Sequence, residues 1–327
     1  MPEELKHDYT DLIPEAILSA IESIGYETSG RMLALNSYEN RVYRCELEGG
    51  GAVVGKFYRP DRWSDAAIGE EHRFAFELLE QEIPVVAPLK LQENRTLGRH
   101  GKIFFAVFPK KSGRSFDEYN DDQWLELGRL LGRTHCVGAA KLPADRIIMA
   151  PHRSTRQQVD YILKTGFIPP DLLAKYQELT EILITEITPL FVGIEMIRIH
   201  GDCHFSNLIY RPDESFYIID FDDMSVGPPV QDFWMLLPGY MEDSLAEINI
   251  FLEGYETFRN FDRRTLRLIE PLRAMRYIHY TAWCAHQVAE DGESRVAEDF
   301  GSHAYWQAEI NDLADQLERI REGKFTR

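Results

Sequence analysis

The stretch RIHGDCHFSNLIYRPDESFYIIDFDD, from Arg198 to Asp223, is the part of this chain from which the fold can be inferred. It begins with a His-Gly-Asp-x-x-x-x-Asn motif and continues into a short apolar run, Tyr217 to Ile219. Turn-forming residues precede this run, so we expect a short buried strand and not a helix. The pattern predicts that Asp202, Asn207 and Asp220 lie on two loops separated by one hairpin-like excursion.

These three side chains have the chemistry that phosphoryl transfer requires. The transition state of that reaction needs positioning and charge neutralisation more than covalent assistance. Asp202 would accept or orient the proton of an attacking hydroxyl group, and Asn207 and Asp220 would hold Mg²⁺ against the phosphates of ATP. Asp220 is thus both a catalytic and a metal-binding candidate. Ordinary turn and cap residues are the alternative, and the ordered set of three argues against it.

The composition of the whole chain limits the class of protein. Of its 327 residues 44% are hydrophobic, enough for a sizeable core in one large or two modest domains. No apolar run approaches the ~20 residues of a membrane span, the N-terminus is too acidic for a signal peptide, and the four cysteines are scattered. We therefore expect a cytoplasmic protein without a membrane partner. The formal net charge of −18 argues against nucleic-acid binding and favours a basic substrate segment.

Three strands are predicted early in the chain, over residues 32–35, 41–47 and 52–58, after a leading helix over 13–24. The loop between the first two strands lies where protein kinases place a glycine-rich loop over the phosphates, yet it contains no glycine. Small polar side chains could replace part of a backbone cradle, so Ser37 is a candidate nucleotide contact. An ordinary Asn-Ser turn is the alternative.

Lys56 lies within the otherwise apolar strand VVGKFY, where a buried charge needs a partner or a ligand. A lysine whose stem extends to water is the alternative. The next helix, over 64–80, favours a partner, because Glu71 falls on its apolar stripe and a carboxylate there needs a cation. We predict an ion pair between Lys56 and Glu71 at the nucleotide site, with Glu70 as the second choice. In the kinase template such a lysine contacts the α and β phosphates.

The apolar segment KIFFAVFP, residues 102–109, is predicted to be the strand that closes the first lobe. Backbone N–H and C=O groups from Ala106 to Phe108 could there bind the edge of adenine between apolar walls. A plain core strand is equally compatible with this pattern. From residue 121 onward the pattern is helical, and Asp232 is placed to cap its helix or to hold the catalytic loop by hydrogen bonds.

Taken in order, these elements predict an α+β fold of two lobes, like that of the protein kinases. Residues 1–108 would form a nucleotide-binding lobe with a leading helix and a small antiparallel β-sheet. Residues 109–327 would form a mainly helical lobe that carries the catalytic and substrate-binding groups.

Several motifs together resemble a known family. The segments LNSYENRVY, KFYRPDRW, HGDCHFSN and GPPVQDFWML are similar to those of the aminoglycoside phosphotransferase and choline kinase-like branch of the protein-kinase fold. More narrowly, over about residues 35–285, the chain resembles the stress response kinase A family of bacterial serine/threonine protein kinases. The resemblance implies an ATP- and Mg²⁺-dependent enzyme that phosphorylates serine or threonine of proteins, itself included, in a stress response. It also implies that Asp202 is the proton acceptor, that Asn207 and Asp220 bind Mg²⁺, and that Ser37 lies in the ATP site.

The chain departs from the eukaryotic protein kinases at several positions. Gly201 stands where an arginine usually precedes the catalytic Asp, Asp222 replaces the final glycine of D-F-G, and there is no A-P-E segment. Without that arginine a phosphorylated activation loop loses its usual partner, so we expect a constitutively assembled site. Asp222 could contact a second metal or the ligands of the first.

Two other functions compete with a protein kinase. A small-molecule kinase of the aminoglycoside, choline or homoserine type shares every catalytic residue named above. The other is a nucleotide-binding scaffold without turnover. The proton acceptor beside two metal ligands argues against it, because a scaffold has no need of that group. The leading interpretation predicts a protein partner with a serine or threonine acceptor, this chain included, and a monomer.

Overall fold

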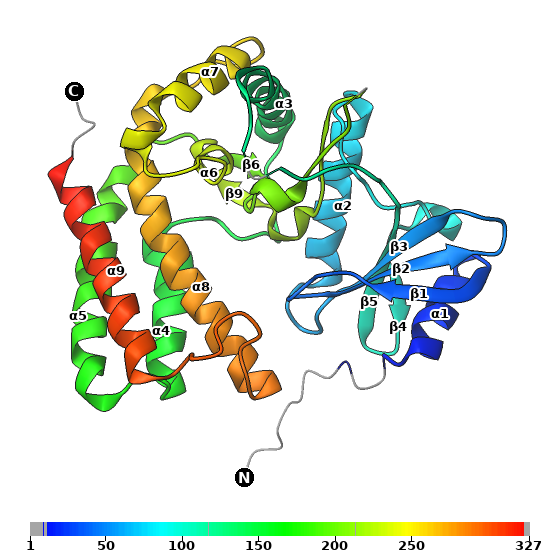
Figure 1. Ribbon diagram of the computed structural model, residues 1–327, viewed down its shortest axis with the longest axis horizontal. Helices are drawn as coiled ribbons and strands as arrows, with labels where there is room; N and C mark the ends of the chain where they lie inside the picture. The colour runs from blue at the N-terminus through cyan, green and yellow to red at the C-terminus, as the bar shows by residue number, and fades with distance from the viewer. Residues whose placement is uncertain (1–8, 10–11, 117, 213, 324–327) are drawn as a thin grey trace.

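The first part of the chain forms a five-stranded antiparallel sheet in the order β1-β2-β3-β5-β4 (Figure 1). A computed structural model describes residues 9, 12–116, 118–212 and 214–323. β1 begins earlier than predicted, because Gly30 has a φ of 78° at a register shift inside the strand and does not end it. The strands are β1 (Thr28–Ala34), β2 (Arg41–Leu47), β3 (Ala52–Phe57), β4 (Gly98–His100) and β5 (Ile103–Pro109).

Two helices, α1 (Pro14–Ser23) and α2 (Asp65–Glu80), cover opposite faces of this sheet. α1 packs against the face that carries Phe57 and Phe105. Neighbouring residues of a strand point to opposite faces, so Lys56 points away from α1 and toward α2. The nucleotide site predicted around Lys56 therefore lies on the α2 face of the sheet.

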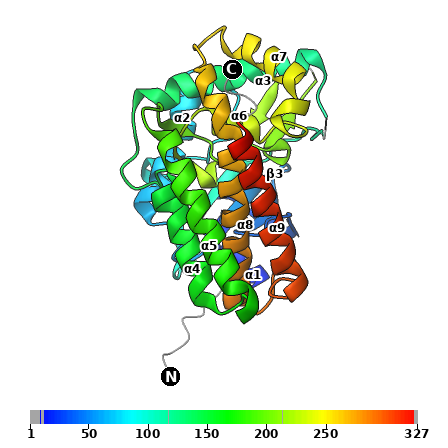
Figure 2. The same cartoon turned by 90° about the vertical axis from the view of Figure 1, so that its left-hand side faces the viewer.

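The second part of the chain is mainly helical. Its helices are α3 (Asp121–Ala140), α4 (Arg156–Thr165), α5 (Pro170–Ile187), α6 (Val230–Trp234), α7 (Leu245–Tyr255), α8 (Ile269–Asp291) and α9 (His303–Glu322). Figures 1 and 2 show α4, α5, α8 and α9 side by side, away from the sheet, where they share an apolar core around Trp306. The predicted two-lobed α+β architecture is confirmed.

Two short antiparallel ribbons carry the central stretch of the sequence. β6 (Ile197–Ile199) pairs with β9 (Ser225–Gly227), and β7 (Leu208–Tyr210) pairs with β8 (Phe216–Ile218). The second ribbon is the expected hairpin, and Asp220 follows it closely. Among the helices of the described residues, none combines the length and the apolar character that crossing a bilayer requires.

α3 and α7 cross at a distance that only glycine permits. A Cβ atom on Gly128 would lie 2.0 Å from the carbonyl oxygen of Phe251, and one on Gly254 would lie 2.1 Å from that of Leu125. Both obstacles are backbone atoms, which cannot rotate away. This crossing places the second half of α3 against the end of α7.

We predict that Gly128→Ala lowers the free energy of unfolding by about 1–3 kcal/mol, because the new methyl group would overlap a backbone oxygen and force two helices apart. Gly69→Ala in α2 is the matched control, since a methyl group there has nothing within 4 Å. It should stabilise the helix by about 0.5–1 kcal/mol. Urea unfolding midpoints measure both effects, and an unchanged midpoint for Gly128→Ala would contradict the close crossing.

Candidate active site

Lys56 is the buried cation around which the site is assembled. Its Nζ atom lies 2.8 Å from Oδ1 of Asp220, 3.1 Å from Oδ1 of Asp222 and 3.6 Å from Oε1 of Glu71. Burial alone would lower the pKa of Lys56, but the three carboxylates raise it well above its usual value. The ammonium group therefore stays charged and joins β3, α2 and the segment after β8.

The predicted ion pair between Lys56 and Glu71 is present. Burial raises the pKa of Glu71 to about 7, against the opposing effect of Lys56. Glu70, the second choice, has another role: it accepts the backbone N–H groups of Ala144 at 2.7 Å and Asp145 at 2.9 Å. The two neighbouring acids of α2 thus hold different parts of the molecule.

Asp202 is held as an ionised carboxylate. Arg276 of α8 donates to its Oδ1 atom at 2.8 Å, and Nε2 of His204 lies 3.3 Å from Oδ2. Burial would raise the pKa of Asp202, but His204 and Arg276 lower it to about 2. So weak a base suits a loose phosphoryl-transfer transition state, in which the carboxylate orients the hydroxyl group and takes its proton late.

Asn207 and Asp220, the two predicted metal ligands, are tied to each other through the backbone. The C=O of Asn207 accepts the N–H of Ile219 at 3.0 Å, and Nε2 of His200 donates to the C=O of Ile219 at 2.8 Å. Asp220 comes next, in a left-handed conformation with φ 60° and ψ 69°. The metal-binding candidates therefore lie at the meeting point of both loops.

These two residues fit a magnesium ion. The side-chain nitrogen of Asn207 donates to the C=O of Asp202 at 2.9 Å, which leaves its amide oxygen for a metal. The side chain of Asp220 is 47% exposed, so its second oxygen can be reached by a ligand. In the described part of the chain, no three His, Cys, Asp or Glu side chains form a metal-binding group. Two oxygen ligands, completed by water and phosphates, are what Mg²⁺ commonly takes from a protein.

Asp232 holds the catalytic loop, and this decides between its two predicted roles. Its carboxylate accepts the backbone N–H groups of His200 at 2.7 Å and Gly201 at 2.8 Å. Nε2 of His135 lies 3.1 Å from the same carboxylate, and Nδ1 of His135 lies 2.9 Å from the hydroxyl of Tyr255. The N-cap of α6 is Pro229, so Asp232 does not cap the helix. The α3–α7 crossing supports this chain of contacts.

Gly201 explains why the usual arginine before the catalytic aspartate is missing. Its φ is +86°, a conformation that favours glycine, and a Cβ atom there would lie 2.2 Å from the carbonyl oxygen of Asp223. No larger residue fits between the catalytic loop and the segment that follows β8.

The segment that follows β8 is held by two arginines that the sequence patterns did not single out. Arg146, in the loop after α3, donates from Nε to the C=O of Met224 at 2.7 Å and from Nη2 to the C=O of Asp222. Arg62 contacts the carboxylate of Asp222 and that of Asp223, the latter at 2.6 Å. Asp222 therefore lies between Lys56 and Arg62, and their charges lower its pKa despite burial.

The pairing of β5 changes the prediction for adenine. Tyr58 N–H donates to the C=O of Phe104, and the register pairs Lys56 with Ala106 and Val54 with Phe108. In an antiparallel ladder every second pair exchanges both bonds, so the backbone groups of Ala106 and Phe108 are used by β3. Contrary to our expectation, the backbone groups of these two residues are therefore not free to bind adenine. The backbone groups of Val107, between them, point away from β3, and its C=O accepts the N–H of Leu89 at 2.6 Å.

The side chain of Ala106 stays a candidate contact for the nucleotide. It lies opposite Lys56 in the ladder, and opposite residues of an antiparallel pair lie on the same face. Its methyl group is fully buried, as part of a small apolar cluster that Phe108 adjoins.

The loop that carries Ser37 reaches across to α8. Glu39 accepts the indole N–H of Trp283 at 2.5 Å and a guanidinium N–H of Arg59 at 2.9 Å. The ring of Tyr38 meets that of Trp283 edge to face, with centroids 6.2 Å apart. Ser37 is half-buried and makes no hydrogen bond to the other candidate residues within the described structure. The neighbouring side chains hold this loop, so it does not need the glycines of a kinase phosphate loop.

The sequence of this chain is similar to those of known phosphotransferases. Residues 32–269 match the model of the phosphotransferase enzyme family. Stress response kinase A of Escherichia coli (strain K12) is 35% identical over 322 residues, which cover 96% of this chain and 95% of the relative. The serine/threonine protein kinase RdoA of Salmonella typhimurium (strain LT2) is 35% identical over 317 residues, with the same coverage.

The fold is also that of solved kinases. An amicoumacin kinase, solved in complex with AMP-PNP, Ca²⁺ and Ami, superposes with a TM-score of 0.73 at 19% identity, over 99% of this chain and 97% of the other. The chain therefore belongs to the phosphotransferase enzyme family, as a kinase of the group that includes stress response kinase A.

Proposed function

We propose that this kinase transfers the γ-phosphoryl group of ATP to serine or threonine hydroxyl groups of proteins, its own chain included, in a stress response. The observation that carries the proposal is the convergence of Lys56, Glu71 and Asp220 in one ion cluster beside the loop of Asp202 and Asn207. Each of these residue types has a defined task in phosphoryl transfer.

The residues divide the work as follows. Lys56, oriented by Glu71, would bind the α and β phosphates. Mg²⁺, held by Asn207 and Asp220, would supply charge neutralisation on the phosphates. Asp202 would orient the acceptor hydroxyl and take its proton as the new P–O bond forms and the bond to ADP breaks. Because Arg276 and His204 keep this carboxylate ionised, it is ready for that task at neutral pH.

The adenine would lie beside the side chain of Ala106, near Phe108, with hydrogen bonds to backbone groups of this segment that β3 does not use. Ser37 would contact the nucleotide from the loop between β1 and β2. Asp232 holds the loop before Asp202 by a carboxylate, and Arg146 holds the segment after β8 by its guanidinium group. This supports a site that is active without phosphorylation of an activation loop.

The acceptor class is supported by the similarity to the Salmonella relative, which is named a serine/threonine protein kinase. Its 35% identity extends over 96% of this chain, so the likeness includes the helical lobe as well as the nucleotide site. The chain is acidic overall, which favours a basic protein segment as the acceptor.

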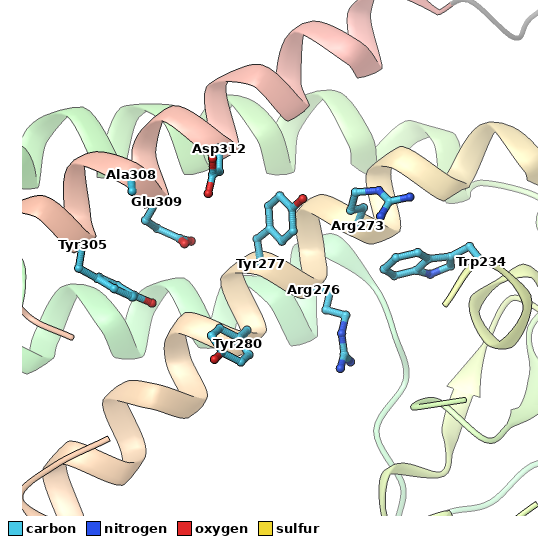
Figure 3. Close-up of a pocket in the computed structure, with 9 residues that line it drawn as sticks. All are labelled: Trp234, Arg273, Arg276, Tyr277, Tyr280, Tyr305, Ala308, Glu309 and Asp312. Atoms are coloured by element: carbon cyan, nitrogen blue, oxygen red, sulfur yellow. The ribbon is translucent and has the colours of Figure 1, made fainter. Parts of the chain in front are cut away.

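A small-molecule kinase is the second candidate, and one observation favours it. A cavity of about 560 Å³ lies beside Arg276, the partner of Asp202 (Figure 3). That volume is within the range of about 300–1,000 Å³ that small-molecule sites occupy. The amicoumacin kinase shares the whole fold.

Incubation of the purified protein with γ-labelled ATP and Mg²⁺ separates the two candidates. Label on the chain itself or on a basic protein supports the proposal. Label found on hydroxylated metabolites alone, with none on protein, would replace it by the second candidate.

We predict that Asp202→Asn lowers kcat by roughly 10²- to 10⁴-fold, because the amide can neither accept the proton nor orient the hydroxyl group as an anion. Binding of ATP, measured by calorimetry, should be retained. Asp160→Asn, at an exposed position of α4, is the matched control and should keep full activity. Unchanged turnover in Asp202→Asn would refute the role assigned to Asp202.

Glu71→Gln and Glu70→Gln form a second matched pair. Loss of the charge at Glu71 should raise the KM for ATP about tenfold, because Lys56 loses the partner that orients it. Glu70→Gln should change this KM much less, since the carboxylate of Glu70 bonds the backbone at residues 144–145 and does not pair with Lys56. Steady-state kinetics at varied ATP gives the comparison, and equal KM values for the two variants would count against the Lys56–Glu71 assignment.

A further inference from the structure

One buried hydroxyl group touches the Lys56–Glu71 pair and has no part in the roles assigned above. It belongs to Tyr58, the residue after β3, which is 1% exposed and donates to Oε1 of Glu71 at 3.4 Å. Strand alternation places Tyr58 on the same face of the sheet as Lys56, whose Nζ atom lies 4.9 Å from the centre of the tyrosine ring. Tyr58 therefore contacts both members of the ion pair.

Glu71 has few donors for a buried carboxylate. The residue is 2% exposed, and its Oε2 atom has no hydrogen-bond partner among the described residues. Lys56 lies 3.6 Å from Oε1, while the same ammonium group lies closer to Asp220 and Asp222, at 2.8 and 3.1 Å. The ion pair alone therefore holds Glu71 loosely, and the hydroxyl group of Tyr58 supplies a second contact that fixes Oε1.

Tyr58 is held in turn by His72, the neighbour of Glu71 on α2. Nε2 of His72 lies 2.8 Å from the hydroxyl oxygen of Tyr58, and Nδ1 lies 2.7 Å from the hydroxyl oxygen of Thr96, in the segment before β4. The imidazole is buried, and Phe108 of β5 meets it edge to face with ring centres 6.3 Å apart. A chain of hydrogen bonds thus connects the segment before β4 to the carboxylate of Glu71.

The direction of this hydrogen-bond chain follows from its chemistry. Burial and the charge of Lys56 lower the pKa of His72 to about 3, so the imidazole is neutral and has a single N–H group. The hydroxyl group of Tyr58 also has one proton, which it can donate either to His72 or to Glu71. A carboxylate is the stronger acceptor. Tyr58 therefore donates to Glu71 and accepts from Nε2–H of His72, while Nδ1 accepts from the hydroxyl group of Thr96.

We propose that Tyr58, His72 and Thr96 are positioning residues for phosphoryl transfer. Together they fix the carboxylate of Glu71, which orients the ammonium group of Lys56 toward the phosphates of ATP. The inference rests on the proposed role of the Lys56–Glu71 pair at the nucleotide. The three side chains act through Glu71 and do not touch the reacting atoms, so their removal should weaken nucleotide binding.

The first test determines the direction of the chain without nucleotide. In ¹⁵N NMR spectra at pH 7, the ring signals of His72, assigned by their loss in His72→Gln, should show a proton on Nε2 and none on Nδ1. Tyr58→Phe removes the acceptor of Nε2–H, so the proton should move to Nδ1, where Thr96 can accept it. A proton on Nδ1 in the wild-type protein would overturn the proposal, because Tyr58 would then donate to His72 and not to Glu71.

The second test measures the Kd of AMP-PNP with Mg²⁺ by calorimetry, which needs no acceptor. Tyr58→Phe keeps the ring and loses only the hydroxyl group, and it should raise the Kd about three- to tenfold. Tyr176→Phe is the matched control. The hydroxyl group of Tyr176, on α5 in the helical lobe, is buried without a hydrogen-bond partner among the described residues, so its loss should leave the Kd unchanged.

Variants of His72 provide a rescue experiment. His72→Met fills a similar volume without an N–H group, so it should raise the Kd in the same direction as Tyr58→Phe. His72→Gln keeps an N–H donor for the hydroxyl group of Tyr58 and should restore a Kd close to that of the wild type. Equal Kd values for His72→Met and His72→Gln would show that only the volume of the side chain matters, and would overturn the role of His72.

A double-mutant cycle separates positioning from a purely structural role. In the Glu71→Gln background, Tyr58→Phe should have no further effect on the Kd, because the hydroxyl group acts only through that carboxylate. An effect of equal size in both backgrounds, or none in the wild type, would overturn the inference. An unchanged Kd in Glu71→Gln itself would instead overturn the proposed role of the pair at the nucleotide, and a proton on Nε2 of His72 would then show that the chain exists without that role.

Discussion

One buried ammonium group, that of Lys56, joins the parts of the structure on which the site depends. A charge removed from water is stable only with close partners, and Lys56 has carboxylates from α2 and from the segment after β8. The sheet supplies the cation, the first helix supplies one anion, and the second lobe supplies the others. The contact between the lobes and the position of Asp220, the candidate metal ligand, are thus consequences of the same ion cluster.

The catalytic segments are held from the other side by buried polar groups. Asp232 bonds the backbone of the loop before Asp202, and His135 connects this acid to Tyr255. These contacts need α3 and α7 to cross closely, which the glycines at the crossing allow. Groups fixed in this way need little reorganisation during a reaction, and preorganised charge is the main source of catalysis in phosphoryl transfer.

Much of this could be predicted from local patterns. The Asp and Asn of the catalytic loop are close in sequence, and a short hairpin leads to Asp220, so neighbouring positions were enough to identify them. The Lys56–Glu71 pair required only strand alternation, helical spacing and the cost of a buried charge. The two-lobed fold followed from the change from period-two to helical patterns along the chain. The adenine prediction was less accurate, because which backbone groups of β5 are free depends on its pairing with β3.

Some residues contact partners that are far away in the sequence, and tertiary structure alone decided their roles. Arg62, Arg146 and Arg276 have no local pattern that distinguishes them among 36 lysines and arginines. Each acquires its role from an acid or carbonyl group on a distant element. His72 is one of ten histidines in the sequence, and only the packing of α2 against the sheet places it between Tyr58 and Thr96. Sequence patterns report which face of an element is apolar, whereas partners and cavities arise when separate elements pack together.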